Sequence, residues 1–214
     1  MALWLVGILA GLAFIILFRE QLHAEWHAFS TDRTAWLKKM WKEWGEPFLI
    51  AALIAIFIRS FLLGPYKIPT GSMRTTLLEG DRIFVDKITY RFRPPSRGEI
   101  VVFKYPLDPK KDFVKRLIAF EGEEVEIRDG AVFVNGKRLE EPTQIASHYY
   151  YNRSDWAYAK EGQKIKVPLG ALFVLGDNSA QSSDSRNWGF VPKSYLVGRA
   201  FLIWWPFNRF GFVS

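Results

Sequence analysis

Residues 123–136, EEVEIRDGAVFVNG, place two turn signals between short apolar runs. Asp-Gly at 129–130 and Asn-Gly at 135–136 both favour two-residue hairpin turns, because these residue types accept the left-handed backbone that such turns require. The runs beside them are rich in β-branched residues and have the length of strands. The stretch therefore predicts antiparallel strands joined by tight hairpins.

The same pattern continues through the chain from Gly64 onward. Short runs with β-branched and aromatic residues, separated by Gly, Pro, Asn and Asp, occupy residues 81–92, 98–106, 112–120 and 171–178. No internal repeat, glycine-rich dinucleotide motif or P-loop accompanies them. We expect residues 64–214 to form one mainly β domain with antiparallel strands.

Two apolar segments precede this domain. Residues 1–18 carry no charged side chain and approach the length of a transmembrane helix. A cleaved signal peptide is the alternative, although it would need a basic start and a shorter apolar core. Residues 47–63, with Arg59 near their end, predict a second transmembrane helix. A buried helix of a soluble protein is the alternative there, because the charge-free part, 47–58, has only twelve residues.

Residues 19–46, between these segments, form a polar loop that contains several Lys and Arg residues. The positive-inside rule places such a loop in the cytoplasm, so we expect the β domain on the outer side of the membrane. The tryptophans of the loop suit either interfacial anchoring or a self-packing amphipathic helix. Near the chain end, FLIWWPFNRFGF at 201–212 suits either a core strand or an aromatic lip at the membrane interface.

The composition excludes several catalytic devices. The 214 residues include no cysteine and only three histidines, so a thiol nucleophile, a disulfide framework and a Cys- or His-rich metal site lack their residues. The net charge of +7 suits nucleic acid or an anionic membrane surface, but no basic run is interleaved with aromatic residues. We expect membrane lipid as a partner, and no nucleic acid, metal or cofactor.

Ser72 lies on a turn within residues 68–87, where a serine is ordinarily a capping residue. As a nucleophile it would need a base, and no histidine has a supporting acid pattern. A lysine desolvated by apolar neighbours is an alternative base, because burial lowers its pKa. In the run DFVKRLIAF, strand alternation places Phe113, Lys115 and Leu117 on one face, although a strand lysine is ordinarily solvated.

Three segments together resemble the bacterial type I signal peptidases, membrane-bound Ser-Lys endopeptidases that remove signal peptides from exported proteins. IPTGSMRTTLLEGDRIFVDK (68–87) resembles the nucleophile segment of that family, FVKRLIAFEGEEV (113–125) its lysine segment, and GDNSAQSSDSRNWGFVP (176–192) its late segment. Two expected membrane helices ahead of a β domain also match. The resemblance therefore spans essentially the whole chain.

The resemblance implies roles for the matching residues. Ser72 would be the nucleophile, and Lys115 would act first as general base and then as general acid. The backbone N–H of Ser72 and the hydroxyl of Thr70 would form the oxyanion hole, with Thr where the family often has Ser. The residues implied to support the dyad are Ser182, Asp184 and Arg186, and those implied to line apolar subsites are Ile68, Pro69, Met73, Leu77, Phe113 and Val114. From the local sequence alone, the residues implied to support the dyad could equally be ordinary turn residues, and those implied to line subsites could equally belong to the core.

The implied function is cleavage of preprotein signal peptides after small-x-small sequences, commonly Ala-x-Ala, on substrates delivered by the secretion machinery. Ser72 follows Leu63 by nine residues, which keeps it within roughly 30 Å of the membrane exit even in a fully extended chain. A specialised processing protease with the same dyad is one alternative, and a membrane-anchored β domain without catalysis is another. A self-cleaving repressor would need a DNA-binding helix-turn-helix.

Overall fold

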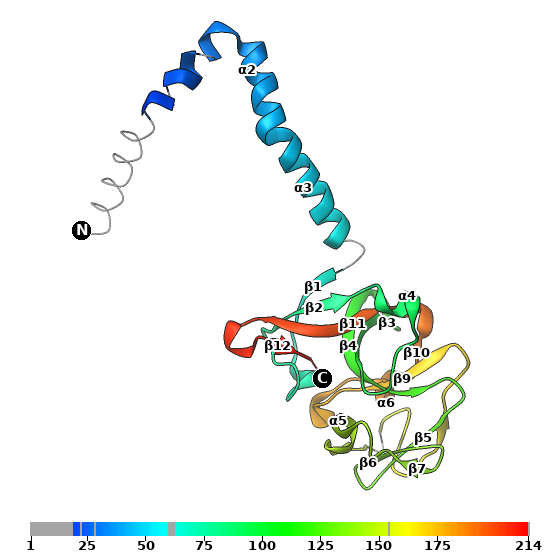
Figure 1. Cartoon of the computed structure of the whole chain (residues 1–214). Coiled ribbons are helices and arrows are strands. Elements are labelled where there is room, and N and C mark those ends of the chain that lie inside the picture. Colours follow the sequence, from blue (N-terminus) through cyan, green and yellow to red (C-terminus); the bar gives the residue numbers. More distant parts are fainter. Residues whose placement is uncertain (1–18, 22, 28, 60–62, 154, 214) are drawn as a thin grey trace, which may run out of the picture. The chain divides into compact units, whose positions relative to one another are not determined.

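The computed structural model describes residues 19–213 except 22, 28, 60–62 and 154 (Figure 1). The chain divides into two compact units, residues 1–56 and residues 57–214. The first expected transmembrane segment, residues 1–18, lies outside the described residues.

The described part of the amino-terminal unit is helical. Its regular elements are α2 Arg33–Met40, the π-helical turn η1 Trp41–Gly45 and α3 Glu46–Phe57, and most described residues of 19–31 are helical as well. The expected polar loop at 19–46 therefore contains regular secondary structure along most of its length.

Capping and aromatic contacts explain the helical structure of this region. The carboxylate of Asp32 accepts the backbone N–H groups of Thr34 and Ala35 at 2.9 and 3.0 Å, so it caps the start of α2. The indole of Trp36 donates to Glu25 at 2.7 Å, and its ring meets that of Phe29 edge-on at 5.1 Å. These contacts fit the self-packing alternative.

The helix α3 is apolar on all sides. Neither α2 nor α3 contains a buried residue, and the side chains of Phe48, Leu53 and Ile56 are each more than half exposed. Over the part of the chain that the structure describes, no helix combines the length and the apolar character needed to span a membrane. The expected transmembrane helix at 47–63 is therefore not confirmed.

The second unit is built from two antiparallel sheets. The larger sheet has the order β1-β2-β11-β3-β4-β9-β10, with β12 paired to β11, and the smaller has the order β7-β6-β5-β8. The strands are β1 Leu63–Lys67, β2 Arg82–Asp86, β3 Ile100–Tyr105, β4 Asp108–Phe120, β5 Glu124–Arg128, β6 Ala131–Val134, β7 Lys137–Arg138, β8 Ile165–Lys166, β9 Ala171–Leu175, β10 Val191–Pro192, β11 Leu196–Trp205 and β12 Gly211–Phe212. The short helices are α4 Thr89–Phe92, α5 Thr143–Ala146 and α6 Ser185–Trp188. The expected mainly antiparallel β fold is confirmed.

Both predicted hairpin turns are present in the smaller sheet. Asp129 and Gly130 join β5 to β6 with φ values of 51° and 74°. Asn135 and Gly136 join β6 to β7 with φ values of 52° and 76°. The positive φ values explain why these residue types occupy the turns.

Two expected strands differ in extent. The strand expected over 81–92 ends at Asp86, because its carboxylate accepts the N–H groups of Ile88 and Thr89 and starts α4. The aromatic run near the chain end belongs to the larger sheet up to Trp205, the last residue of β11, which lies between β2 and β3. Trp205, Phe207, Phe210 and Phe212 are exposed, and their contact with a membrane interface stays a prediction.

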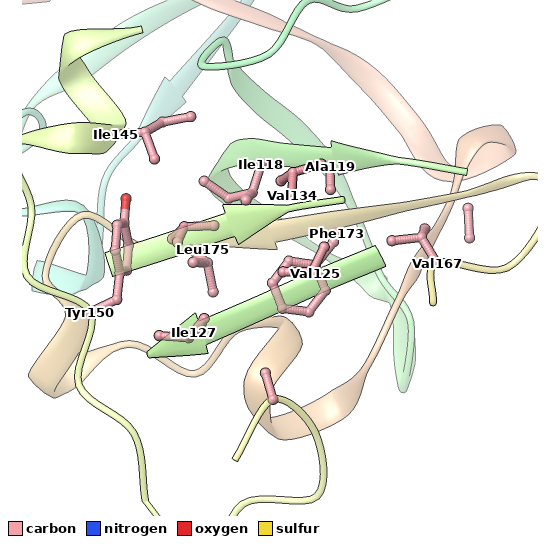
Figure 2. Packing of buried hydrophobic residues seen from close by; sticks show 13 residues of the cluster. Ile118, Ala119, Val125, Ile127, Val134, Ile145, Tyr150, Val167, Phe173 and Leu175 are labelled. Atoms are coloured by element: carbon pink, nitrogen blue, oxygen red, sulfur yellow. The ribbon is translucent and has the colours of Figure 1, made fainter. Parts of the chain in front are cut away.

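The strand β4 connects three hydrophobic clusters. Ile118 belongs to the cluster beneath the smaller sheet (Figure 2), and Leu117 belongs to the cluster around Phe103. Val114 packs against a third cluster, which contains residues that follow β1. Charged residues at positions 115 and 116 of this strand are therefore surrounded by core.

Candidate active site

Ser72 lies in a one-turn 3-10 helix, η3 Gly71–Met73. Met73 is fully buried and anchors this turn in the core. Asn178 holds its backbone: the N–H of Asn178 donates to the carbonyl of Ser72 at 3.1 Å, and its side-chain Nδ2 donates to the carbonyl of Gly71 at 2.8 Å. The Ser72 side chain is consequently fixed in a turn, with 9% of the residue exposed.

Lys115 of β4 points its amine at this serine. Its Nζ lies 2.7 Å from Ser72 Oγ and 3.0 Å from the carbonyl of Val114, and only 3% of the residue is exposed. The ring of Phe113 lies 5.6 Å from Nζ. Phe113 and Leu117 both pack with the cluster around Phe103, which confirms the strand alternation predicted for this segment.

Burial lowers the pKa of Lys115 from its ordinary value of 10.5 to about 8. The carboxylates of Asp184 and Asp177 oppose this change by favouring the ammonium, and the Arg186 guanidinium reinforces it. Desolvation is the largest of these effects. A substantial fraction of Lys115 is therefore neutral in mildly alkaline solution.

A buried ion pair adjoins the Ser72–Lys115 pair. Arg116 meets the carboxylate of Asp177 through two hydrogen bonds of 2.8 and 2.7 Å, and both side chains are almost completely buried. Thr76 donates its hydroxyl to the same carboxylate at 2.5 Å, and Arg116 also donates to the carbonyl of Gly98 at 2.7 Å. This pair links β4, the segment after the serine and the segment after β9.

Sequence reasoning did not identify Arg116 or Asp177 as site residues. A signal was present, because an arginine inside an apolar strand is almost never fully buried without a charged partner. The partner, however, lies 61 residues further along the chain. Its identity depends on the tertiary fold.

A second buried ion pair joins Asp184 and Arg186, which were both predicted site residues. Arg186 binds the carboxylate of Asp184 through hydrogen bonds of 2.8 and 2.7 Å, and neither residue is exposed. Asp184 also accepts the backbone N–H of Gly176 at 3.0 Å. A side chain at Gly176 would lie 2.1 Å from Ser182 Oγ and 2.5 Å from the carbonyl of Ser72, so only glycine fits there.

Other predicted residues occupy varied positions. Ser182, which the resemblance implies as the serine that hydrogen-bonds and orients the lysine, is buried beside Gly176, but its hydroxyl has no hydrogen-bond partner among the described residues. Thr70 has an extended backbone and is exposed, directly before η3. His148 lies 3.4 Å from the hydroxyl of Thr75 and 2.5 Å from the carbonyl of Gln144.

The predicted subsite residues form a layer around the serine turn. Ile68, Met73 and Leu77 are buried members of one core cluster, against which Val114 packs. Pro69 is exposed, and Phe113 and Val114 are partly exposed. Their contact with a substrate stays a prediction.

The chemistry available to this arrangement is nucleophilic. A serine hydroxyl within hydrogen-bond distance of a desolvated amine has a base for its proton, which is the requirement for attack on a carbonyl. The neighbouring carboxylates of Asp177 and Asp184 are each held by a buried arginine. Lys115 is therefore the basic group in contact with Ser72.

Comparison with known proteins gives consistent matches. A family model described as signal peptidase, peptidase S26, matches residues 41–205. A probable signal peptidase I-2 of Synechocystis sp. is 42% identical over 81% of this chain and 78% of its own length. Signal peptidase I T of Bacillus subtilis is 36% identical over 84% of this chain and 94% of its own length. A solved signal peptidase I from Enterococcus faecalis is 31% identical, with a TM-score of 0.41 over 50% of this chain and 97% of that chain.

The Arg116–Asp177 pair yields a stability prediction. Arg116→Met leaves a buried carboxylate without its cation, so we expect the free energy of unfolding to fall by about 3–5 kcal/mol. The double variant Arg116→Met/Asp177→Leu should recover most of this loss, because no buried charge remains. Denaturant unfolding of the full chain gives the free energy of unfolding for the parent protein, the single variant and the double variant.

The exposed pair Arg153–Asp155 supplies the control, since each side chain is 63% exposed. Arg153→Met should leave the unfolding midpoint unchanged, because solvent screens that pair. Equal midpoints for Arg116→Met and Arg153→Met would contradict a structural role for the buried pair.

Proposed function

The chain belongs to the signal peptidase family, peptidase S26, and from this premise we propose that it removes amino-terminal signal peptides from preproteins with Ser72 as nucleophile and Lys115 as base. The observation that carries the proposal is the 2.7 Å contact between Lys115 Nζ and Ser72 Oγ in a buried setting. The family is one of serine endopeptidases, so the reaction class does not depend on the choice of residues.

The proposed reaction begins with a proton transfer. Neutral Lys115 accepts the proton of Ser72 while Oγ attacks the carbonyl carbon of the scissile peptide bond. The resulting ammonium then protonates the leaving amine, and the acyl group stays on Ser72. Neutral Lys115 next takes a proton from water as the water attacks the ester. Lys115 then returns this proton to Ser72 Oγ as the ester bond breaks, which releases the signal peptide with a free carboxylate.

The oxyanion of the tetrahedral intermediate needs hydrogen-bond donors. We assign these to the backbone N–H of Ser72, which lies in the first turn of η3, and to the hydroxyl of Thr70. One such donor is typically worth about 3 kcal/mol of barrier. Ser182, Asp184 and Arg186 support the dyad in this proposal.

Substrate selection is assigned to the layer around the serine turn. Met73 and Leu77 are fully buried, while Val114 and Phe113 offer partly exposed apolar surface. Shallow apolar subsites favour small side chains. We therefore propose cleavage after small-x-small sequences, with Ala-x-Ala as the typical case.

The membrane placement is also proposed. Residues 1–18 and 47–63 would cross the bacterial inner membrane, with residues 19–46 in the cytoplasm and residues 64–214 on the periplasmic side. The exposed apolar side chains of α3 support this, because a helix with apolar residues on every side favours a non-aqueous environment. The exposed aromatic residues beyond β11 suit the interface.

The dyad is tested with a purified preprotein that has Ala at the −1 and −3 positions. Ser72→Ala and Lys115→Ala should each lower kcat/KM at least about a thousandfold, because they remove the nucleophile and its base. Lys111→Ala, an exposed lysine of the same strand, should cleave normally. A preprotein with Leu at both positions should stay uncut. Normal cleavage by Lys115→Ala would reject the dyad.

The depressed pKa of Lys115 predicts the pH dependence. Only the neutral amine can accept the serine proton, so kcat/KM should be low below pH 7, rise through a pKa of about 8 and level off at higher pH. Initial rates over a pH series measure this rise of kcat/KM, the acid limb of the pH profile. A limb near 10.5, the ordinary value for lysine, would contradict activation by burial.

The proposed topology is tested by labelling single cysteines, since the natural chain has none. In intact spheroplasts a membrane-impermeant maleimide should label Lys137→Cys, whereas Ala35→Cys should react only after permeabilisation. Both positions are exposed in their own units. The reverse pattern of labelling would overturn the orientation, and release of the chain by carbonate washing would overturn membrane insertion.

A further inference from the structure

Residues 150–153 and 155–158 contact Arg186 through Tyr151, Trp156 and Tyr158. Tyr151 accepts a hydrogen bond from Arg186 Nη1 at 2.5 Å through its carbonyl, and the N–H of Tyr158 donates to the carbonyl of Arg186 at 2.9 Å. Tyr151 also donates its N–H to Ser179 Oγ at 2.7 Å. The backbone of this segment is therefore attached to the residues around α6.

All five N–H donors of Arg186 have partners in the plane of the guanidinium. Nε and Nη2 bind Asp184, Nη2 and Nη1 bind the carbonyl and hydroxyl of Ser179 at 3.0 and 2.7 Å, and Nη1 binds Tyr151. The remaining route for water is through a face of the plane. Trp156 covers one face, with its ring centroid 4.3 Å from Arg186 Cζ.

Trp156 is itself 93% buried, since only 7% of the residue is exposed. A tryptophan stacked on an arginine excludes water and adds a cation–π attraction, which is stronger for desolvated groups. From Arg186 the contacts continue through Asp184 to the N–H of Gly176. Gly176 in turn approaches the Ser72 carbonyl so closely that no side chain fits between them.

We infer that Trp156 is a positioning residue for the proposed hydrolysis: its ring seals one face of Arg186 and thereby holds Asp184 and Gly176 in place beside Ser72 and Lys115. This inference rests on the proposed function of the dyad. In this role, residues 150–153 and 155–158 shield the Asp184–Arg186 pair from water on the side of α6 where Trp156 packs.

The charged groups around Lys115 determine in which direction its pKa would change if the Trp156 ring were removed. Asp184 and Asp177 favour its ammonium form, Arg186 opposes it, and Arg116 neutralises Asp177. Without the ring, water reaches the Asp184–Arg186 pair, and Arg186 then opposes the effect of Asp184 on Lys115 less strongly. Lys115 also becomes less desolvated. Both changes raise the pKa of Lys115.

The test compares the acid limb of kcat/KM in Trp156 variants of the full chain. Trp156→Ala should move the limb upward by about half a pH unit, which lowers kcat/KM about threefold at pH 7 through protonation alone. Trp156→Phe should keep the parent limb, because a smaller aromatic ring still covers the guanidinium. If the alanine variant does not fold, Trp156→Leu takes its place, with a shift in the same direction.

Trp204 is the matched control. It is also partly buried and stacks on an arginine, Arg82, at 5.5 Å, but it lies on β11 and does not contact Arg186. Trp204→Ala should lower thermal stability without moving the acid limb. An unmoved limb in the Trp156→Ala or Trp156→Leu variant would overturn the inference, as would an equal shift in Trp204→Ala.

The outcomes separate the two proposals. If Ser72→Ala or Lys115→Ala still cleaves the preprotein, the proposed dyad is wrong. If both variants are inactive and the limb of the Trp156 variants does not move, the dyad stands and only the positioning role is rejected.

Discussion

Three cationic side chains lie inside the core of the β unit, and the difference between them determines the chemistry of the site. Arg116 and Arg186 each meet a buried carboxylate through two hydrogen bonds. Lys115 meets a serine hydroxyl and a backbone carbonyl, and it forms no ion pair with any residue that the structure describes. Burial disfavours a charge that has no counter-charge, so the pKa of Lys115 falls and the lysine moves toward its neutral form.

The two ion pairs also determine where the lysine can act. Gly176 and Asn178, on either side of Asp177, both contact the serine turn. Asp177 and Asp184 favour the ammonium form of Lys115, and without its arginine each carboxylate would do so more strongly. The arginines therefore let the two carboxylates hold this segment without fixing the proton on the lysine.

Much of the fold was accessible from sequence because its signals are local. The Asp129–Gly130 and Asn135–Gly136 turns follow from two residues each, and the alternation around Lys115 follows from one strand. The α4 turn was not predicted because a strand-like pattern of residues continues past Asp86, where the carboxylate accepts the N–H groups of Ile88 and Thr89 and the strand ends. In the region 19–46 a self-packing amphipathic helix was only one of two alternatives, because the polar sequence also resembles a loop.

Within the site, too, some residues could be recognised from local sequence, whereas other contacts depend on the tertiary fold. Ser72 and Lys115 were found through motifs, but the Arg116–Asp177 pair and the stacking of Trp156 on Arg186 join residues that are far apart in the chain. No local pattern specifies which carboxylate will neutralise a buried arginine. Likewise, the aromatic residues of 150–153 and 155–158 do not indicate which residues they contact until the fold places Trp156 against Arg186 of α6.

The claim on which the site depends is that burial beside Ser72 lowers the pKa of Lys115 far enough for its neutral form to serve as the base. The most direct measurement is an NMR titration of the ¹³Cε resonance of Lys115 in the full chain in detergent, assigned by comparison with Lys115→Ala. A midpoint near 8 is the predicted result. A midpoint near 10.5 would contradict it, because the amine would then remain an ammonium ion in contact with Ser72.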